Sequence, residues 1–261
     1  MVNMALLKVT YQNQQLLVAS DRRAGPEHLV LFLHGLGCTR ASFQDALTFQ
    51  GLNAFAIMTC DFIGYGGSSK PANFSYTLEG QATIISNILE QIKPERISVV
   101  GHSMGGAIGL LVAKKLSNLV SFISIEGNLV AQDCGLVSRG IANQTLDEFV
   151  NNGYQVFLKS LQTSKRPDFI KWAEWYAQSS PEALYHSAKS LVGWSDSGEL
   201  LTIFNSLAKK AYIYGDEDSK DYLLPQLKET QKIMINDAGH FAMVDNPSKL
   251  YTNIVSILSQ S

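Results

Sequence analysis

The sequence has few of the features that mark secreted, membrane or metal-binding proteins. Its 261 residues include 3 cysteines, and these are widely spaced. An odd, scattered set does not predict a disulfide framework or a zinc site, and it favours a reducing cytoplasm. No stretch approaches the roughly 18 apolar residues of a membrane span, and the N-terminus lacks the charged and apolar segments of a signal peptide. We therefore expect a cytoplasmic protein without a membrane span.

Neither sign of charge is in excess. The formal net charge is −2 at pH 7, and the sequence contains no basic cluster. Nucleic acid and anionic membranes are therefore not expected as partners, which leaves a small-molecule substrate as the expected one. A hydrophobic content of 46% is ample for a packed core in one large domain or two smaller ones. Composition does not determine the oligomeric state.

Predicted strands and helices alternate along most of the chain. A hairpin is predicted over residues 6–20, and alternation follows: strand Leu29–Leu33, helix Ala41–Phe49, strand Phe55–Thr59, helix Leu78–Ile92, strand Ile97–Val100, helix Ala107–Leu116 and strand Val120–Ile125. Strands that are apolar throughout and alternate with helices predict a parallel sheet. The expected fold class is α/β, with a mostly parallel, twisted sheet covered by helices on both faces.

The strand pattern stops after residue 127 and returns at Lys210–Tyr214. We therefore predict a core of residues 1–127 and 200–261 with an inserted helical cap, residues 128–199. In the cap, Trp172, Trp175 and Tyr176 have the i, i+3, i+4 spacing of one helix face. Such an aromatic stripe more often packs a helix against a core, but Trp172 and Trp175 are also candidate residues of an apolar substrate pocket.

The most informative segment is Gly101-His102-Ser103-Met104-Gly105, which lies between a predicted strand and a predicted helix. It matches G-x-S-x-G in the context that gives this pattern its meaning. A serine hydroxyl is a poor nucleophile unless it is exposed beside a base, and a sharp strand-to-helix turn exposes it. The turn also directs the N-terminus of the helix toward any oxyanion that forms next to the serine.

The sequence contains five short motifs whose identity and order are typical of one superfamily. They are H-G-L-G at 34–37, D-F-I-G-Y-G-G-S at 61–68, G-H-S-M-G-G at 101–106, G-D-E-D at 215–218 and G-H-F-A-M-V-D-N-P at 239–247. Through them the chain resembles the α/β-hydrolase superfamily over nearly its whole length. The resemblance implies an α/β-hydrolase fold and a serine nucleophile.

The resemblance also implies a set of site residues. His240 is the expected base and Ser103 the nucleophile. The G-x-x-D spacing selects Asp218 as the acid, and the main alternative is Glu126, which ends the strand after the nucleophile helix and is otherwise a pocket residue. The oxyanion is expected to bind to the backbone N–H groups of Leu36 and Met104.

The implied reaction is hydrolysis of a small or medium carboxylic ester or lactone through an acyl-enzyme on Ser103, with no metal and no organic cofactor. Two alternatives remain open. One is a carbon–carbon bond hydrolase of the meta-cleavage type, in which Arg139 or Arg166 would anchor a carboxylated substrate. The other is a ligand receptor that keeps the catalytic residues but has little turnover.

Overall fold

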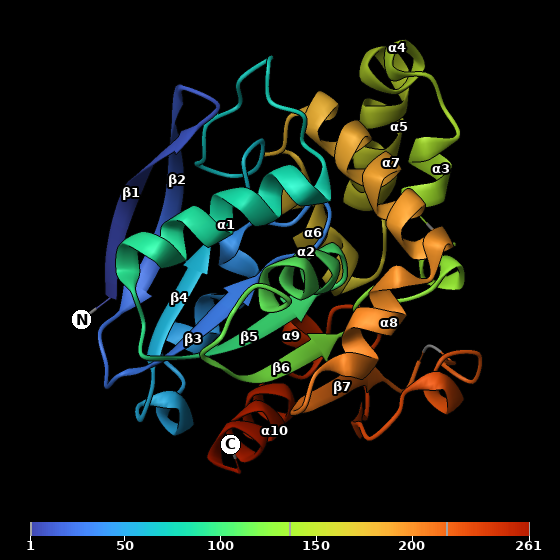
Figure 1. The fold of residues 1–261 in the computed structure, drawn as a ribbon. Helices are drawn as coiled ribbons and strands as arrows, with labels where there is room; N and C mark the ends of the chain where they lie inside the picture. Colours follow the sequence, from blue (N-terminus) through green and yellow to red (C-terminus); the bar gives the residue numbers. More distant parts are fainter. Residues whose placement is uncertain (1, 136, 218, 261) are drawn as a thin grey trace.

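The computed structural model describes residues 2–135, 137–217 and 219–260. Its centre is an eight-stranded sheet (Figure 1). An antiparallel hairpin, β1 (Val2–Tyr11) and β2 (Gln14–Arg23), begins the chain, and both residues of its turn, Gln12 and Asn13, have positive φ. This left-handed pair suits the twist of a two-residue hairpin. The predicted hairpin is confirmed, and its strands are longer than expected.

The six later strands run parallel to one another. The order across the sheet is β1-β2-β4-β3-β5-β6-β7-β8, with β2 antiparallel to β4. The parallel strands are β3 (His28–Leu33), β4 (Ala56–Cys60), β5 (Arg96–His102), β6 (Leu119–Ile125), β7 (Lys210–Gly215) and β8 (Gln231–Ile235). The predicted α/β class with a mostly parallel sheet is confirmed.

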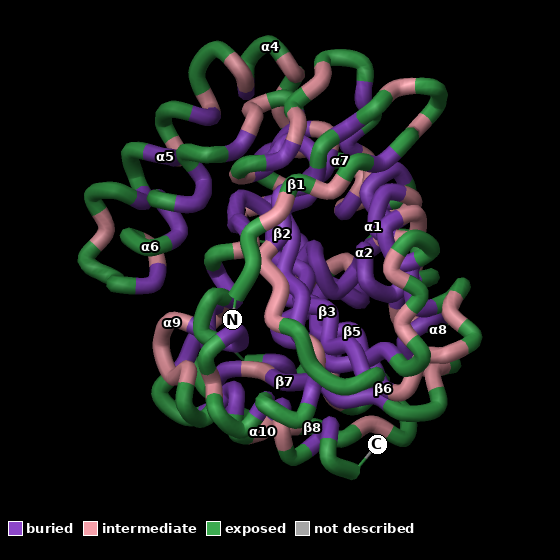
Figure 2. Tube along the Cα trace, turned by 90° about the vertical axis from the view of Figure 1, so that its left-hand side faces the viewer, coloured by how far each residue is buried: buried purple, intermediate pink, exposed green. Residues whose placement is uncertain are grey.

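Helices cover both faces of this sheet, as Figures 1 and 2 show. On one face lie α1 (Leu78–Ile92), α2 (Met104–Ala113) and α8 (Glu199–Ser206). On the other lie α9 (Ala242–Asp245) and α10 (Pro247–Ser259). Strands β3, β4, β5, β6 and β7 are largely buried between these layers, which explains their mainly apolar sequences, whereas most residues of the edge strand β8 are exposed (Figure 2).

The remaining helices lie over the carboxyl ends of the parallel strands (Figure 1). They are α3 (Ser138–Ala142), α4 (Leu146–Glu148), α5 (Tyr154–Gln162), α6 (Pro167–Tyr176) and α7 (Pro181–Ser197). We call residues 128–199 the cap segment, although its status as a separate domain stays a prediction. Its predicted end falls inside the first turn of α8, whose Phe204 packs against Phe122 of the core.

Two predicted helices differ from the observed ones. Residues Arg40–Leu47 form a 3₁₀ segment that is interrupted at Phe43, because the Arg40 N–H is bound to the Asp61 carboxylate and Phe43 is buried against Phe32. Helix α2, which follows Ser103, begins at Met104, three residues before its predicted start. Glycines obscured that start because their helix propensity is low.

None of the helices within the described ranges has the length and apolar character needed to cross a lipid bilayer.

Candidate active site

Ser103 occupies the turn between β5 and α2. Its backbone has φ 52° and ψ −124°, a conformation that residues other than glycine rarely adopt. The turn is tight because the first turn of α2 lies against the end of β3: a Cβ atom on Gly105 would lie 2.3 Å from the Leu33 carbonyl oxygen and 2.4 Å from that of His34. The strained, exposed turn predicted from the G-x-S-x-G pattern is therefore present, with Ser103 at its apex.

The loop after β3 lies beside this turn. His34 is fully buried, and its Nδ1 donates to the Gly35 carbonyl at 2.9 Å while its Nε2 accepts the Phe62 N–H at 3.1 Å. Burial lowers the pKa of His34, which agrees with the neutral ring that these two bonds require. Within the described residues the Leu36 amide has no hydrogen-bond acceptor. The Met104 amide begins α2, so it belongs to the N–H groups that a helix leaves unpaired.

Glu126 lies directly after β6 and also has positive φ, 49°. Its carboxylate is buried. Oε1 accepts the Gly215 N–H at 2.8 Å, and Oε2 lies 3.7 Å from Nδ1 of His240 and 2.6 Å from Nζ of Lys220. Burial by itself raises the pKa of Glu126, but the contact with His240 and the charge of Lys220 outweigh it and lower the pKa. Glu126 is therefore ionised at neutral pH.

His102 supports the loop that carries His240. Its Nε2 donates to the His240 carbonyl oxygen at 2.9 Å, and the two rings lie 4.8 Å apart. Burial, followed by the charge of His240, places the pKa of His102 well below its ordinary value. A neutral ring therefore adds no positive charge next to His240.

The structure brings most of the predicted residues to one cavity of about 380 Å³. Ser103, His240, Glu126, Leu36 and Trp172 all line it. Asp218 lies outside the described residues, so its predicted role stays a prediction. Glu126, the alternative acid, is the carboxylate that the structure places against His240.

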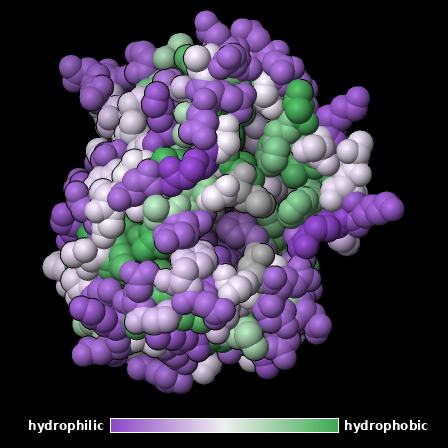
Figure 3. Space-filling model, turned by 90° about the vertical axis from the view of Figure 1, so that its right-hand side faces the viewer, coloured by the Kyte–Doolittle hydropathy of each residue, from purple (hydrophilic) through white to green (hydrophobic). Residues whose placement is uncertain are grey.

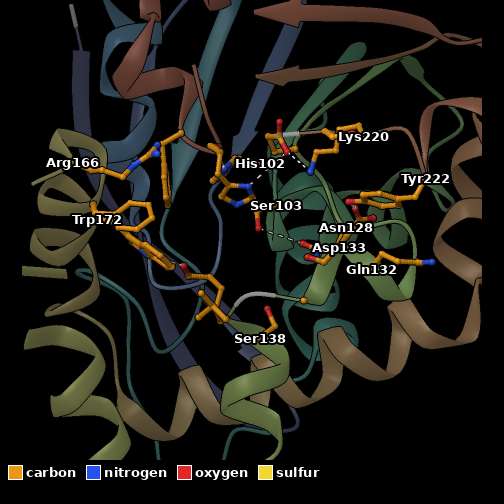
Figure 4. Close-up of a pocket in the computed structure, with 18 residues that line it drawn as sticks. His102, Ser103, Asn128, Gln132, Asp133, Ser138, Arg166, Trp172, Lys220 and Tyr222 are labelled. Carbon is orange, nitrogen blue, oxygen red and sulfur yellow. Dashed lines mark hydrogen bonds and ion pairs between the residues drawn. The ribbon is translucent and has the colours of Figure 1, made fainter. Parts of the chain in front are cut away.

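Sequence reasoning missed two residues of this site. The Asn128 side chain accepts a hydrogen bond from Ser103 Oγ at 3.3 Å, and Lys220 forms the ion pair with Glu126 (Figure 4). The position of Asn128, three residues beyond β6, which lies next to the strand that precedes Ser103, was the available signal. Lys220 lies in a loop without a motif, and nothing in its sequence context indicated its role.

Two kinds of side chain form the walls of the cavity, which opens in the hollowed face of Figure 3. In Figure 4, Trp172 and Arg166 lie on one side of Ser103, and Asn128, Asp133, Gln132, Lys220 and Tyr222 lie on the other. Phe169 and Phe241 add to the first wall. One wall is therefore mainly aromatic, and the other is polar.

The aromatic face of α6 both packs against the core and contributes to the cavity wall. Trp172 donates its indole N–H to the Leu36 carbonyl at 3.1 Å and lines the cavity. Tyr176 is fully buried against the core, and Trp175 is buried without being among the described residues that line the cavity. The face therefore packs the cap segment on the core and supplies one aromatic wall residue.

The two arginines considered as substrate anchors have different surroundings. Arg139 pairs with Asp196 away from the cavity lining. Arg166 lines the cavity and is bound by Asp168 at 2.9 Å and by Glu217 at 3.0 Å. Its charge is therefore largely balanced by protein carboxylates.

Comparisons with known sequences agree with this architecture. A family model described as alpha/beta hydrolase fold matches residues 28–247. Lipase 1 of Psychrobacter immobilis and Lipase 3 of Moraxella sp. are 24% and 23% identical to this chain over 235 residues, covering 83% of this chain and 72% of each lipase. An uncharacterized protein of Mycobacterium tuberculosis is 29% identical over 124 residues, 45% of this chain. The match spans 34% of that protein, about a third of its length.

Solved structures also superpose on nearly the whole chain. An N-acyl homoserine lactonase mutant complexed with N-hexanoyl homoserine lactone has a TM-score of 0.80 at 16% identity, covering 98% of this chain and 97% of that one. A thermophilic esterase from Thermogutta terrifontis has a TM-score of 0.78 at 17% identity, covering 99% and 98%. At these identities the likeness shows the fold.

The close approach at Gly105 yields a first prediction. Gly105→Ala is expected to lower the free energy of unfolding by about 1–3 kcal/mol, because its Cβ would overlap two backbone carbonyl oxygens that cannot easily move. Urea denaturation followed by circular dichroism measures the change. Gly140→Ala in α3 is the matched control, since a Cβ there meets no atom within 4 Å. Equal stability of the two variants would contradict the prediction.

Proposed function

We propose that this chain, which belongs to the α/β-hydrolase family, is a serine hydrolase that cleaves small or medium carboxylic esters or lactones through an acyl-enzyme on Ser103. One observation carries the proposal: a serine in a strained turn and a histidine paired with a buried carboxylate line the same cavity. The lipases to which the chain is similar support ester bonds as the target.

The first half of the proposed reaction transfers the acyl group to the enzyme. Ser103 Oγ, whose hydrogen points to Asn128 in the resting site, turns to His240 and attacks the substrate carbonyl carbon. His240 takes the hydroxyl proton and then delivers it to the leaving alcohol oxygen as the ester C–O bond breaks. The amides of Leu36 and Met104 stabilise the negative oxygen of the tetrahedral intermediate.

The second half returns the enzyme to its starting state. His240 removes a proton from water, the hydroxide oxygen bonds to the acyl carbon, and the bond to Ser103 Oγ breaks as His240 returns the proton to it. The products are one carboxylic acid and one alcohol, or a hydroxy acid from a lactone.

We assign the role of the acid to Glu126. Its Oε2 lies 3.7 Å from His240 Nδ1, so it favours the tautomer in which Nε2 is unprotonated and it stabilises the imidazolium that forms in both halves of the reaction. The Gly215 N–H on Oε1 holds the carboxylate in this orientation. Asp218, predicted from the motif spacing, is the alternative against which this assignment is tested.

The first test concerns the nucleophile. Ser103→Ala is expected to lower ester turnover by about four to six orders of magnitude, because the other groups cannot form an acyl-enzyme. Initial rates on p-nitrophenyl butyrate measure the loss, and an unchanged melting temperature shows that the fold is intact. Residual activity within tenfold of the parent, in protein free of contaminating esterase, would reject the serine mechanism. A parent protein that binds esters without turning them over would favour the receptor alternative.

The second test separates the two candidate acids. Glu126→Gln is expected to lower kcat by about 10³–10⁴-fold, since an amide can hold the histidine in the wrong tautomer and cannot stabilise the imidazolium. Asp218→Asn, the matched change, is expected to have a much smaller effect. Kinetics of both variants on one ester decide the question, and the reverse order of effects would assign the acid to Asp218.

The third test concerns the aromatic wall. Each buried methylene contributes about 0.8 kcal/mol, or up to about fourfold in specificity, so medium-chain esters should be preferred over acetate. The preference should stop rising at the chain length that extends beyond the aromatic wall. Trp172→Ala should lower kcat/KM for octanoate more than for acetate because Trp172 lines the cavity. Trp175→Ala, a change of the same size at a buried position on the same helix, should lower both equally. Equal losses of kcat/KM for octanoate and acetate in Trp172→Ala would show that Trp172 only packs the cap segment and does not contact the acyl chain.

A further inference from the structure

Lys220 is a mostly buried lysine at the catalytic carboxylate, and the reaction as written above does not use it. Its side chain is 10% exposed, and its Nζ lies 2.6 Å from Glu126 Oε2. The backbone position of this lysine is well defined, because its carbonyl accepts the N–H groups of Leu223 and Leu224, both at 2.9 Å. Lys220 lines the cavity together with Ser219 and Tyr222.

Two groups share a single carboxylate oxygen. His240 Nδ1 lies 3.7 Å from Glu126 Oε2 on one side, and Lys220 Nζ lies 2.6 Å from it on the other. The ammonium group therefore occupies part of the attraction that Glu126 would otherwise give to a protonated His240. It also repels the imidazolium directly. The Lys220 and Glu126 side chains are buried, whereas the His240 side chain is 36% exposed, so solvent screens part of this repulsion.

We propose that Lys220 is a positioning residue that fixes the Glu126 carboxylate and, through its charge, sets the pH above which His240 can act as the base. The proposal rests on the serine hydrolase function proposed above. A positive charge beside an imidazole favours its neutral form. Loss of the Lys220 charge is therefore expected to favour the protonated ring, which cannot accept the Ser103 proton.

Other charged or titratable groups lie around His240 and Glu126. Arg166 is paired with Asp168 and Glu217. Burial keeps His102 neutral and raises the pKa of Tyr212 far above its usual value. The remaining carboxylates of the described residues here accept backbone N–H bonds; they are Asp133, Asp216 and Asp245. All of these groups are the same in the parent and in variants of Lys220, so a difference between the proteins isolates the lysine.

The experiment compares the pH dependence of kcat/KM for parent, Lys220→Met and Lys220→Arg on p-nitrophenyl butyrate. Lys220→Met removes the charge but keeps most of the stem, so the midpoint of the acid limb should rise by on the order of one pH unit. Lys220→Arg keeps the charge and should restore the parent midpoint to within a few tenths of a unit. Lys220→Gln serves as a second neutral variant if the methionine variant does not fold.

A buried lysine elsewhere supplies the control. Lys210 on β7 is also buried, and its Nζ is bound by the carbonyl oxygens of Asn205 and Leu207. Lys210→Met removes a buried ammonium group without changing the charge next to Glu126, so its acid limb should stay at the parent midpoint. A role of Lys220 in loop structure alone would lower activity in Lys220→Met without moving the midpoint.

A second readout does not depend on turnover. The imidazole of His240, assigned by the signal lost in His240→Asn, is titrated by NMR in the parent and in the Lys220 variants. A higher His240 pKa in Lys220→Met, with the parent value in Lys220→Arg, supports the proposal even if the parent hydrolyses no ester, in which case the proposed function fails by itself. An unchanged His240 pKa in Lys220→Met, or an equal rise in Lys220→Arg, overturns the proposal.

Discussion

The close contact between the first turn of α2 and the end of β3 is the constraint on which the site depends. There is no space for a Cβ at Gly105, so the helix can approach the Leu33 and His34 carbonyls closely. This approach forces the intervening Ser103 into a conformation that costs about 1–3 kcal/mol, and the parallel sheet on either side of β5 supports it. The strained turn places the hydroxyl and the free end of α2 beside the same cavity. The proposed nucleophile and one proposed oxyanion donor therefore result from one packing contact.

The second constraint is the burial of the Glu126 charge. Removing a carboxylate from water costs several kcal/mol unless it is paired and hydrogen-bonded. Here the Gly215 N–H from β7, the Lys220 ammonium from the following loop and the His240 ring after β8 surround it. The buried charge of Glu126 is thus satisfied by groups from three segments that follow one another late in the chain, far from Glu126 in sequence. The contacts that would orient His240 for catalysis are the same contacts that make burial of Glu126 tolerable.

These two constraints explain what the sequence could predict. The turn around Ser103 depends on local chemistry, since glycines must flank the serine between a strand and a helix, and it was therefore readable from adjacent residues. Alternation of apolar strands and helices likewise predicted the α/β class. The surroundings of Glu126 depend on which strand ends are neighbours in the sheet. Motif spacing indicated Asp218, whereas the structure describes contacts of Glu126, and the distant Lys220 carried no local signal. The 3₁₀ segment at Arg40–Leu47 was missed for the same reason, because a bond to the distant Asp61 shapes it.

The cap segment and the oxyanion turn are mechanically joined. Trp172 donates to the carbonyl of Leu36, whose amide is a proposed oxyanion donor. The following residue, Gly37, has φ 68°, and a Cβ there would lie 2.6 Å from the Tyr176 ring. Because both rings belong to α6, a displacement of this helix would disturb the packing around the Leu36 backbone. The aromatic wall that would contact a substrate and the amide that would stabilise its oxyanion therefore form one packed unit, so the fit of a substrate against α6 bears directly on the geometry of the oxyanion site.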